Sequence, residues 1–301
     1  MHLVPGSSDP DQPPKRVGRW RRAGRSVAPT LRFWMETEVH VAAFSVAANV
    51  LLSFFPFLIV MLSLCRYVFK WHAATDAIYL ALNYYFPDQL GSFIKRNLIA
   101  TVESRGPFQI ASVLLLLFTA NGVFEPMEVA LNRVFGIAKN RSFFKNQLVS
   151  LALIFACGGL GLLSTTLTAL NQEYLKRFPG LSQQVVANYG TIVFRLSSVP
   201  LVILTLFLIY WLLPNAKIPP LSVVPTAIIV GLMLEALRWV DLLTWPWLRV
   251  RLAGEYGPFV YSVTIILWSF CAAMVVLGGA EWAARHLPAR HLPEDVRVQK
   301  K

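Results

Sequence analysis

Long apolar runs alternate with short polar segments along the chain, and this pattern occurs six times. The clearest run, residues 41–65, holds 25 residues without a charge. A helix needs about 20 mostly apolar residues to cross a bilayer. The pattern therefore predicts an all-α integral membrane bundle of six spans, at residues 39–65, 108–132, 148–170, 191–213, 219–242 and 259–285.

The same pattern divides the chain into three parts. We expect a basic, Pro-rich cytoplasmic tail over 1–38, a six-helix membrane domain over 39–286, and a cytoplasmic tail over 287–301. The first 38 residues show no short apolar core followed by a cleavage site. We therefore expect the first span to act as an uncleaved anchor.

Most connections between the spans are short, and segment 66–107 is the exception. Apolar residues recur at helical spacing within it: Leu90, Phe93, Ile94, Leu98, Ile99 and Val102. This spacing predicts an amphipathic interfacial helix between spans 1 and 2, on the outer face of the membrane. Such a helix either covers the bundle or acts as a lid over an outward-opening cavity.

Composition and charge agree with a membrane protein. With 55% apolar and 15% charged residues, the chain is neither an ordinary soluble protein nor a disordered one. Of its 28 Lys and Arg, 17 fall in the tails and in the loops after spans 2 and 4, and nine fall in the other loops. Basic residues favour the cytoplasmic side. We expect both termini in the cytoplasm, where the net charge of +12 meets anionic lipid rather than nucleic acid.

Motifs for soluble catalysis are missing from the sequence. It contains no GxSxG, HExxH or P-loop pattern, its five His residues show no metal-ligand spacing, and its three Cys residues are far apart. We therefore expect neither enzymatic activity nor a metal or cofactor.

Polar residues inside a span are costly and need a reason. In the first span, Ser45, Asn49 and Ser53 follow i, i+4 and i+8 and share one helix face, with Pro56 expected to kink the helix after them. This stripe either forms hydrogen bonds between helices or lines a polar path.

The end of the second span carries a second polar face. Glu125, Glu128 and Asn132 follow i, i+3 and i+7, with Arg133 next in sequence. Two neighbouring acids repel unless they are paired, protonated or bound to a cation. The candidate partners are Arg133, Arg238 and Arg195. The alternatives are a structural ion-pair network, a proton, ion or substrate site, and simple solvent exposure.

Further acids lie in the last two spans. Glu235 and Arg238 can pair at i, i+3, and Asp241 follows them. Glu281 follows Gly278 and Gly279 near the cytoplasmic end of the last span. In span 3, the glycines of 158–161 permit close helix packing, within the bundle or between protomers, so a homo-oligomer is left open.

Several stretches of this chain resemble the YihY/BrkB family of bacterial inner-membrane proteins. They are AAFSVAANVLLSFFPFLIVMLSL (42–64), FTANGVFEPMEVALNRVFGI (118–137) with the following RSFFKNQLVSL, YWLLPNAKIPP (210–220), GLMLEALRW (231–239), and YGPFVYSVTIILWSF with LGGAEWAA (256–284). Together they cover nearly all of 40–285. Two features depart from the family pattern: Ser262 stands where relatives often have Gly, and the basic N-terminal tail is not part of the pattern.

The resemblance implies a six-span α-helical fold without established catalytic residues. Its motif positions point to Pro56, Glu128, Asn132, Arg133, Pro214, Asn215, Glu235, Arg238 and Glu281. Pro214 and Asn215 are expected to form a turn, and most of the others coincide with the candidate intramembrane polar site.

Three functions follow as hypotheses. The first is a transporter of a solute or a lipid-type substrate, motivated by the buried acids and the polar stripe. The second is a non-transporting scaffold or envelope-integrity protein, which predicts that each acid is paired with a base in a packed interior. The third is a ribonuclease, an older label of the family that finds no acid–base constellation here.

Overall fold

The computed structural model describes residues 29–85, 88–103, 107–137, 141–176, 199–216 and 218–286. The regular elements in these residues are helices, starting with a short helix at 29–34. The others are α2 (Thr37–Ser63), the π-helix η1 (Leu64–Val68), α3 (His72–Tyr85), α4 (Asp88–Glu103), α5 (Pro107–Val134), α6 (Phe143–Lys176), a helix at Val199–Leu212, α8 (Pro220–Tyr256), the 3-10 helix η2 (Gly257–Phe259) and α9 (Val260–His286).

The all-α membrane bundle predicted from the sequence is confirmed. Four helices in the described ranges are long and apolar enough to cross a membrane: Glu38–Val68, Phe144–Gly161, Pro220–Tyr256 and Val260–Arg285. In addition, α5 covers the predicted span 108–132, and the shorter apolar helix Val199–Leu212 covers the described part of 191–213. A helix therefore lies at each of the six predicted positions, and the number of crossings stays a prediction.

Helix α8 continues well beyond its predicted end at residue 242. It has 37 residues and contains Pro225 and Pro246, so at 1.5 Å per residue it is about 55 Å long. Proline removes one backbone hydrogen bond. The helix nevertheless continues through both prolines, including Pro246 between two tryptophans.

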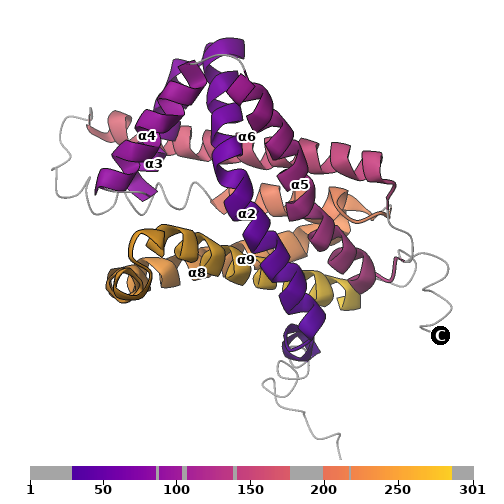
Figure 1. Ribbon diagram of the computed structural model, residues 1–301. Coiled ribbons are helices and arrows are strands. Elements are labelled where there is room, and N and C mark those ends of the chain that lie inside the picture. The colour runs from indigo at the N-terminus through magenta and orange to yellow at the C-terminus, as the bar shows by residue number, and fades with distance from the viewer. Residues whose placement is uncertain are drawn as a thin grey trace, which may run out of the picture.

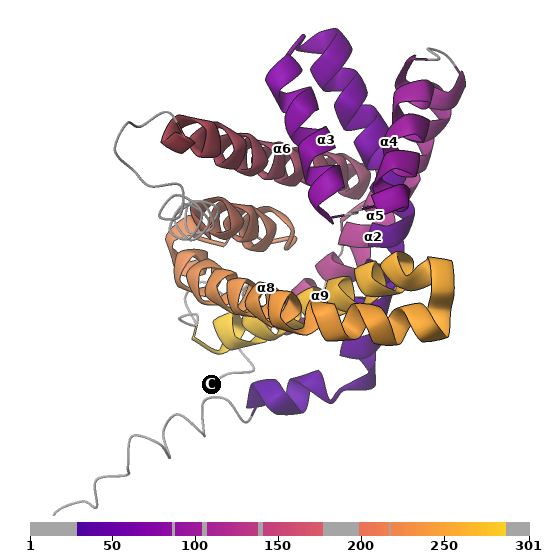
Figure 2. The ribbon, with the colours of Figure 1, turned by 90° about the vertical axis from the view of Figure 1, so that its left-hand side faces the viewer.

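The long helices cross one another closely. Helix α2 contacts both α5 and α9, and α8 and α9 run antiparallel, joined by η2 (Figures 1 and 2). Gly122 of α5 permits one of these crossings, because a Cβ there would lie 2.1 Å from Oδ1 of Asn49 on α2. Gly158 of α6 similarly accommodates Phe57, whereas a Cβ on Gly159 or Gly161 would meet nothing within 4 Å. Packing within the bundle thus accounts for one glycine of span 3, and packing between protomers stays a prediction for the other two.

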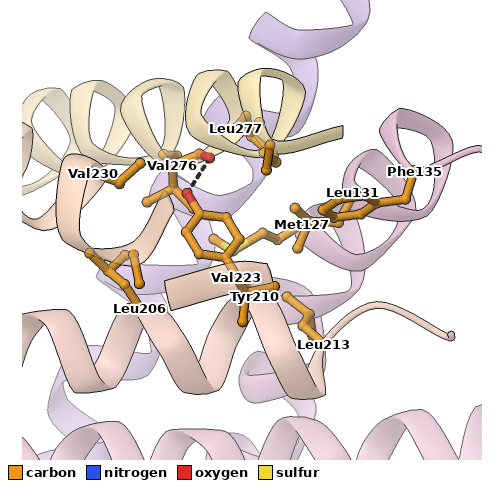
Figure 3. Close-up of a cluster of buried hydrophobic side chains, with 14 of the residues drawn as sticks. Met127, Leu131, Phe135, Leu206, Tyr210, Leu213, Val223, Val230, Val276 and Leu277 are labelled. Atoms are coloured by element: carbon orange, nitrogen blue, oxygen red, sulfur yellow. Dashed lines mark hydrogen bonds between the residues drawn. The ribbon is translucent and has the colours of Figure 1, made fainter. Parts of the chain in front are cut away.

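The larger hydrophobic core joins α2, α5, α9, the start of α8 and helix Val199–Leu212. Tyr210 lies at its centre, fully buried, and its hydroxyl donates to the carbonyl of Val276 at 2.7 Å (Figure 3). A buried phenol needs such a partner, because an unpaired hydroxyl would cost free energy. The bond therefore fixes helix Val199–Leu212 against α9.

A second core lies under the helical hairpin of α3 and α4 (Figure 2). Ile94, Leu98 and Val102 of α4 are buried against α3 and the end of α2, whereas Arg96 is exposed. The amphipathic helix predicted in segment 66–107 is confirmed over Asp88–Glu103, with its apolar face packed against α3 and the end of α2. The sequence analysis missed α3, its partner in the hairpin.

Candidate functional site

Two polar side chains near the end of α5, Glu128 and Asn132, are deeply buried, at 2% and 1% exposed. They lie one helical turn apart, and the Asn132 amide donates to Oε1 of Glu128 at 3.4 Å. Their spacing in the sequence predicted a shared face, and the structure shows that this face points into the protein.

The turn after helix Val199–Leu212 binds to this face of α5. The backbone N–H of Asn215 donates to Oδ1 of Asn132 at 2.8 Å. Pro214 is buried beside it. Two positions singled out by the family resemblance, 83 residues apart, are thereby joined through one side chain.

Arg141, just before α6, completes the group. Its Nη2 donates to the carbonyl oxygens of Leu212 and Pro214 at 2.7 and 3.0 Å. Its backbone N–H donates a hydrogen bond to the carboxylate of Glu128, and its positive charge attracts the same carboxylate. A cation suits this position, because the last carbonyls of a helix are unpaired and carry partial negative charge. We call Glu128, Asn132, Arg141, Pro214 and Asn215 the Asn132 cluster.

Two of the three candidate partners of the α5 acids pair elsewhere in the structure. Glu128 interacts with Arg141, which the sequence analysis counted only as a loop charge. Arg133 instead forms an exposed ion pair with Glu38 at the start of α2, and Arg238 pairs within α8. Arg195, the third expected partner, lies outside the described residues. Glu125 is exposed, whereas Glu128 and Asn132 are buried.

Glu281 belongs to a different group near the end of α9. Its carboxylate forms an ion pair with Arg285 at 2.7 Å and accepts a hydrogen bond from Thr30 at 2.7 Å. The indole N–H of Trp34 donates to the Met274 carbonyl at 2.8 Å. The short helix at 29–34, which falls in the predicted tail 1–38, is therefore attached to α9. The rest of that tail, and 287–301, lie outside the described residues.

The polar stripe of α2 is satisfied mainly within the helix. Asn49 donates to the Ser45 carbonyl at 2.9 Å, and buried Ser53 donates to the Val50 carbonyl at 3.2 Å. Asn49 also lies against Gly122 of α5, and Pro56 is buried inside α2. In this structure the stripe is thus a packing surface between α2 and α5.

The acids of α8 are less enclosed. Glu235 and Arg238 form an ion pair at 3.6 Å, with side chains 16% and 39% exposed. One turn further, Oδ1 of Asp241 is shielded from solvent and has no hydrogen-bond partner among the described residues. Neither position belongs to the Asn132 cluster.

Metal binding finds no support in the described part of the chain. No group of three or more His, Cys, Asp or Glu side chains there could hold a metal ion. Most of the polar groups described above are hydrogen-bonded or ion-paired to one another.

Comparisons with other proteins agree with this architecture. The family described as "Virulence factor BrkB" matches residues 30–299, and these include every polar group described above. The ribonuclease-like protein YfkH of Bacillus subtilis (strain 168) is 25% identical over 254 residues, which cover 81% of this chain and 89% of that protein. No solved structure matches the chain. The match over most of its length shows that the chain is a membrane protein of the BrkB virulence-factor family.

Proposed function

We propose that this protein transports a lipid-type substrate or another solute across the bacterial inner membrane, with both termini in the cytoplasm. One observation carries the proposal. The Asn132 cluster, next to the start of α8, is buried, whereas the polar residues further along α8 are partly exposed. The transporter hypothesis requires such a difference, because alternating access closes one side of the path while the other side admits substrate.

The sealed end is the Asn132 cluster. Glu128 and Asn132 are almost inaccessible, and the bonds of Asn132 and Arg141 fasten the turn at 212–215 to α5 and to the start of α6. Helix α8 begins at Pro220, directly after this turn. Opening this end would require breaking a small number of hydrogen bonds to one short turn.

The more open end is the group Glu235, Arg238 and Asp241. Glu235 lies 15 residues after Pro220, which is about 22 Å along a helix. A helix segment of this length is enough to cross most of the roughly 30 Å hydrocarbon layer. A charged pair at such a depth is expensive and serves as a functional candidate by default.

A lipid-type substrate fits this pair best. Leu232, Trp239 and Leu243 on the same helix are exposed, so the surface of α8 next to the pair is one that acyl chains would cover. The carboxylate of Glu235 can take an ammonium group and the guanidinium of Arg238 a phosphate. A zwitterionic headgroup entering sideways from the bilayer would replace their mutual contact.

The orientation rests on charge. The excess of Lys and Arg in the tails and in the loops after spans 2 and 4 supports a cytoplasmic position for these segments. On that basis the Asn132 cluster faces the cytoplasm, where basic residues also contact anionic lipid. Fusion of a periplasm-active reporter to either terminus should give no signal.

Transport is tested with purified protein in liposomes. Phosphatidylethanolamine with an acyl-chain NBD label keeps its headgroup, and external dithionite bleaches each label that reaches the outer leaflet. We expect faster exchange with the wild type than in protein-free liposomes. In the double variant Glu235→Gln/Arg238→Gln the headgroup loses both charged partners, so the rate should fall about tenfold or more.

The matched control is the exposed pair Arg251 and Glu255 on the same helix, 3.0 Å apart. Arg251→Gln/Glu255→Gln removes the same charges and should exchange lipid at the wild-type rate. Exchange no faster than in protein-free liposomes, or equal rates for the wild type and the Glu235/Arg238 variant, would overturn the lipid transport proposal.

The pairing of Glu128, Glu281 and Arg133 also favours a second candidate, a non-transporting envelope scaffold. A scaffold needs only a rigid, satisfied bundle. It predicts that the Glu235/Arg238 variant restores envelope integrity to a deletion strain as well as the wild type does. Transport predicts that this variant fails.

A further inference from the structure

The turn that joins η1 to α3 has an unusual composition for a solvent-exposed turn. Phe69 and Trp71 are 66% and 44% exposed, and Val68 before them is also exposed. Lys70 lies between the two aromatic residues and is exposed itself. Apolar side chains thus surround one cation at the end of a helix long and apolar enough to span a membrane, Glu38–Val68.

The backbone of this turn is strained at the lysine. With φ of 51°, Lys70 is the one non-glycine residue in the described ranges that adopts positive φ. The position is the end of η1, where Phe69 N–H donates to the Leu64 carbonyl at 2.9 Å and Trp71 N–H to the Cys65 carbonyl at 2.8 Å. Helix ends of this kind usually place glycine at the positive-φ residue, since a Cβ is unfavourable there. Fold stability alone would therefore favour glycine over lysine at position 70.

The charge of Lys70 also has no partner within the described part of the chain. Its neighbour Arg66 forms an ion pair with Glu103 at 3.0 Å, and Lys95 on the facing hairpin lies over the ring of Tyr79. No described residue pairs with the ammonium of Lys70. The nearest acid on α3, Asp76, is six residues away in sequence.

We propose that the turn 68–72 binds the headgroup of an anionic phospholipid, with the phosphate on the ammonium of Lys70 and the glycerol and upper acyl chains against Phe69 and Trp71. Aromatic residues are favoured at this depth of a bilayer, and a lysine beside them reaches the phosphates. A free phosphate would leave Val68, Phe69 and Trp71 uncovered, so the apolar rim points to a lipid.

This site goes beyond the proposed function, because it lies after α2 rather than on α8 and can hold a lipid that is never transported. Failure of one proposal leaves the other standing. The charge bias of the loops places the turn on the outer face, so the lipid would belong to the outer leaflet.

Replacement of Lys70 by glycine separates a structural from a binding role. Lys70→Gly relieves the backbone strain, so its thermal unfolding midpoint in detergent should equal or exceed that of the wild type. Its affinity for dioleoyl phosphatidylglycerol, titrated by native mass spectrometry, should fall about fivefold, the effect of one basic residue at an anionic surface. Lys70→Arg should keep the wild-type affinity, and Lys70→Gln should lose it as Lys70→Gly does.

Two controls make the result specific. Arg96→Gln removes an exposed charge from the same hairpin and should bind phosphatidylglycerol like the wild type, and phosphatidylcholine should bind all variants equally weakly. Unchanged affinity in Lys70→Gly and Lys70→Gln would overturn the proposal. Inorganic phosphate that competes with the lipid at equal concentration would also overturn it, in favour of a free-anion site.

Discussion

The backbone N–H of Asn215 donates to the side-chain oxygen of Asn132 at 2.8 Å, and the amide of Asn132 donates in turn to Glu128. One side chain therefore bridges a turn and a helix that are 83 residues apart in the sequence. Since Asn132 is buried, water cannot replace either bond.

Truncation of Asn132 should destabilise the protein. Asn132→Ala leaves the Asn215 N–H without its acceptor and removes one partner of Glu128, which together should lower the free energy of unfolding by about 1–3 kcal/mol. Thermal unfolding in detergent, followed by circular dichroism, measures the change. The exposed Asn97 of α4 provides the control, because Asn97→Ala should stay within about 0.5 kcal/mol of the wild type.

Substitution of Arg141 tests the fixation of the turn at 212–215. Lysine keeps the charge but loses the planar fork that reaches two carbonyls, so Arg141→Lys should destabilise the fold by about 1–2 kcal/mol and Arg141→Ala by more. Lys145→Ala, at an exposed position nearby, should have little effect. Equal unfolding midpoints for wild type and Arg141→Ala would show that the turn is held without this side chain.

A methyl group at Gly278 should release the short helix at 29–34. The added Cβ would lie 2.4 Å from the indole nitrogen of Trp34, so the helix must shift and its hydrogen bond to Met274 must weaken. Limited trypsin digestion at Arg32 should then be faster in Gly278→Ala than in the wild type. Gly161→Ala meets nothing within 4 Å and should be digested at the wild-type rate.

Alkaline pH should weaken the hairpin of α3 and α4 through Tyr79. Burial raises the pKa of Tyr79 above its ordinary value, and Glu103 and Asp76 raise it further, against the opposing effect of Arg66. The unfolded state therefore releases this proton first. The stabilisation is complete below about pH 10 and is lost as pH rises through the raised pKa.

The unfolding midpoint of the wild type should accordingly fall between pH 9 and pH 11 more steeply than that of Tyr79→Phe. Tyr256 is exposed, and Tyr256→Phe should follow the wild type at each pH. Parallel curves for the wild type and Tyr79→Phe would show that Tyr79 does not contribute to the pH dependence.

Hydropathy predicted the helix positions because each span must bury or expose to lipid a long apolar surface. Helical spacing also predicted that Glu128 and Asn132 share one face, since residues four positions apart lie on the same side of a helix. Arg141 was missed as a site residue because its partners at 212 and 214 are more than 70 residues away. Neither spacing nor composition encodes such a contact.

Sequence analysis missed two helices because their local sequence shows little helical periodicity. The buried face of α3 contains Ala74 and Ala77, whose small apolar surface makes the periodic pattern faint. The helix at 29–34 is short and follows a basic, Pro-rich stretch, and its contacts are with α9, more than 200 residues away. In both cases the tertiary contact, rather than the local sequence, shows that the helix has a buried side.

The unequal arms of the α8–α9 hairpin have a consequence for the membrane itself. With 37 residues against 27, α8 exceeds its partner by about 15 Å and a typical hydrocarbon layer by about 25 Å. A helix that is too long for its bilayer must tilt, project into the headgroups or thicken the lipid around it, and each response costs more in a thin membrane than in a thick one. This protein should therefore respond to bilayer thickness. In reconstituted vesicles, lipids of different chain length should change the tilt of α8. The distance along the membrane normal between the Asn132 cluster and the group Glu235, Arg238 and Asp241 should change with that tilt.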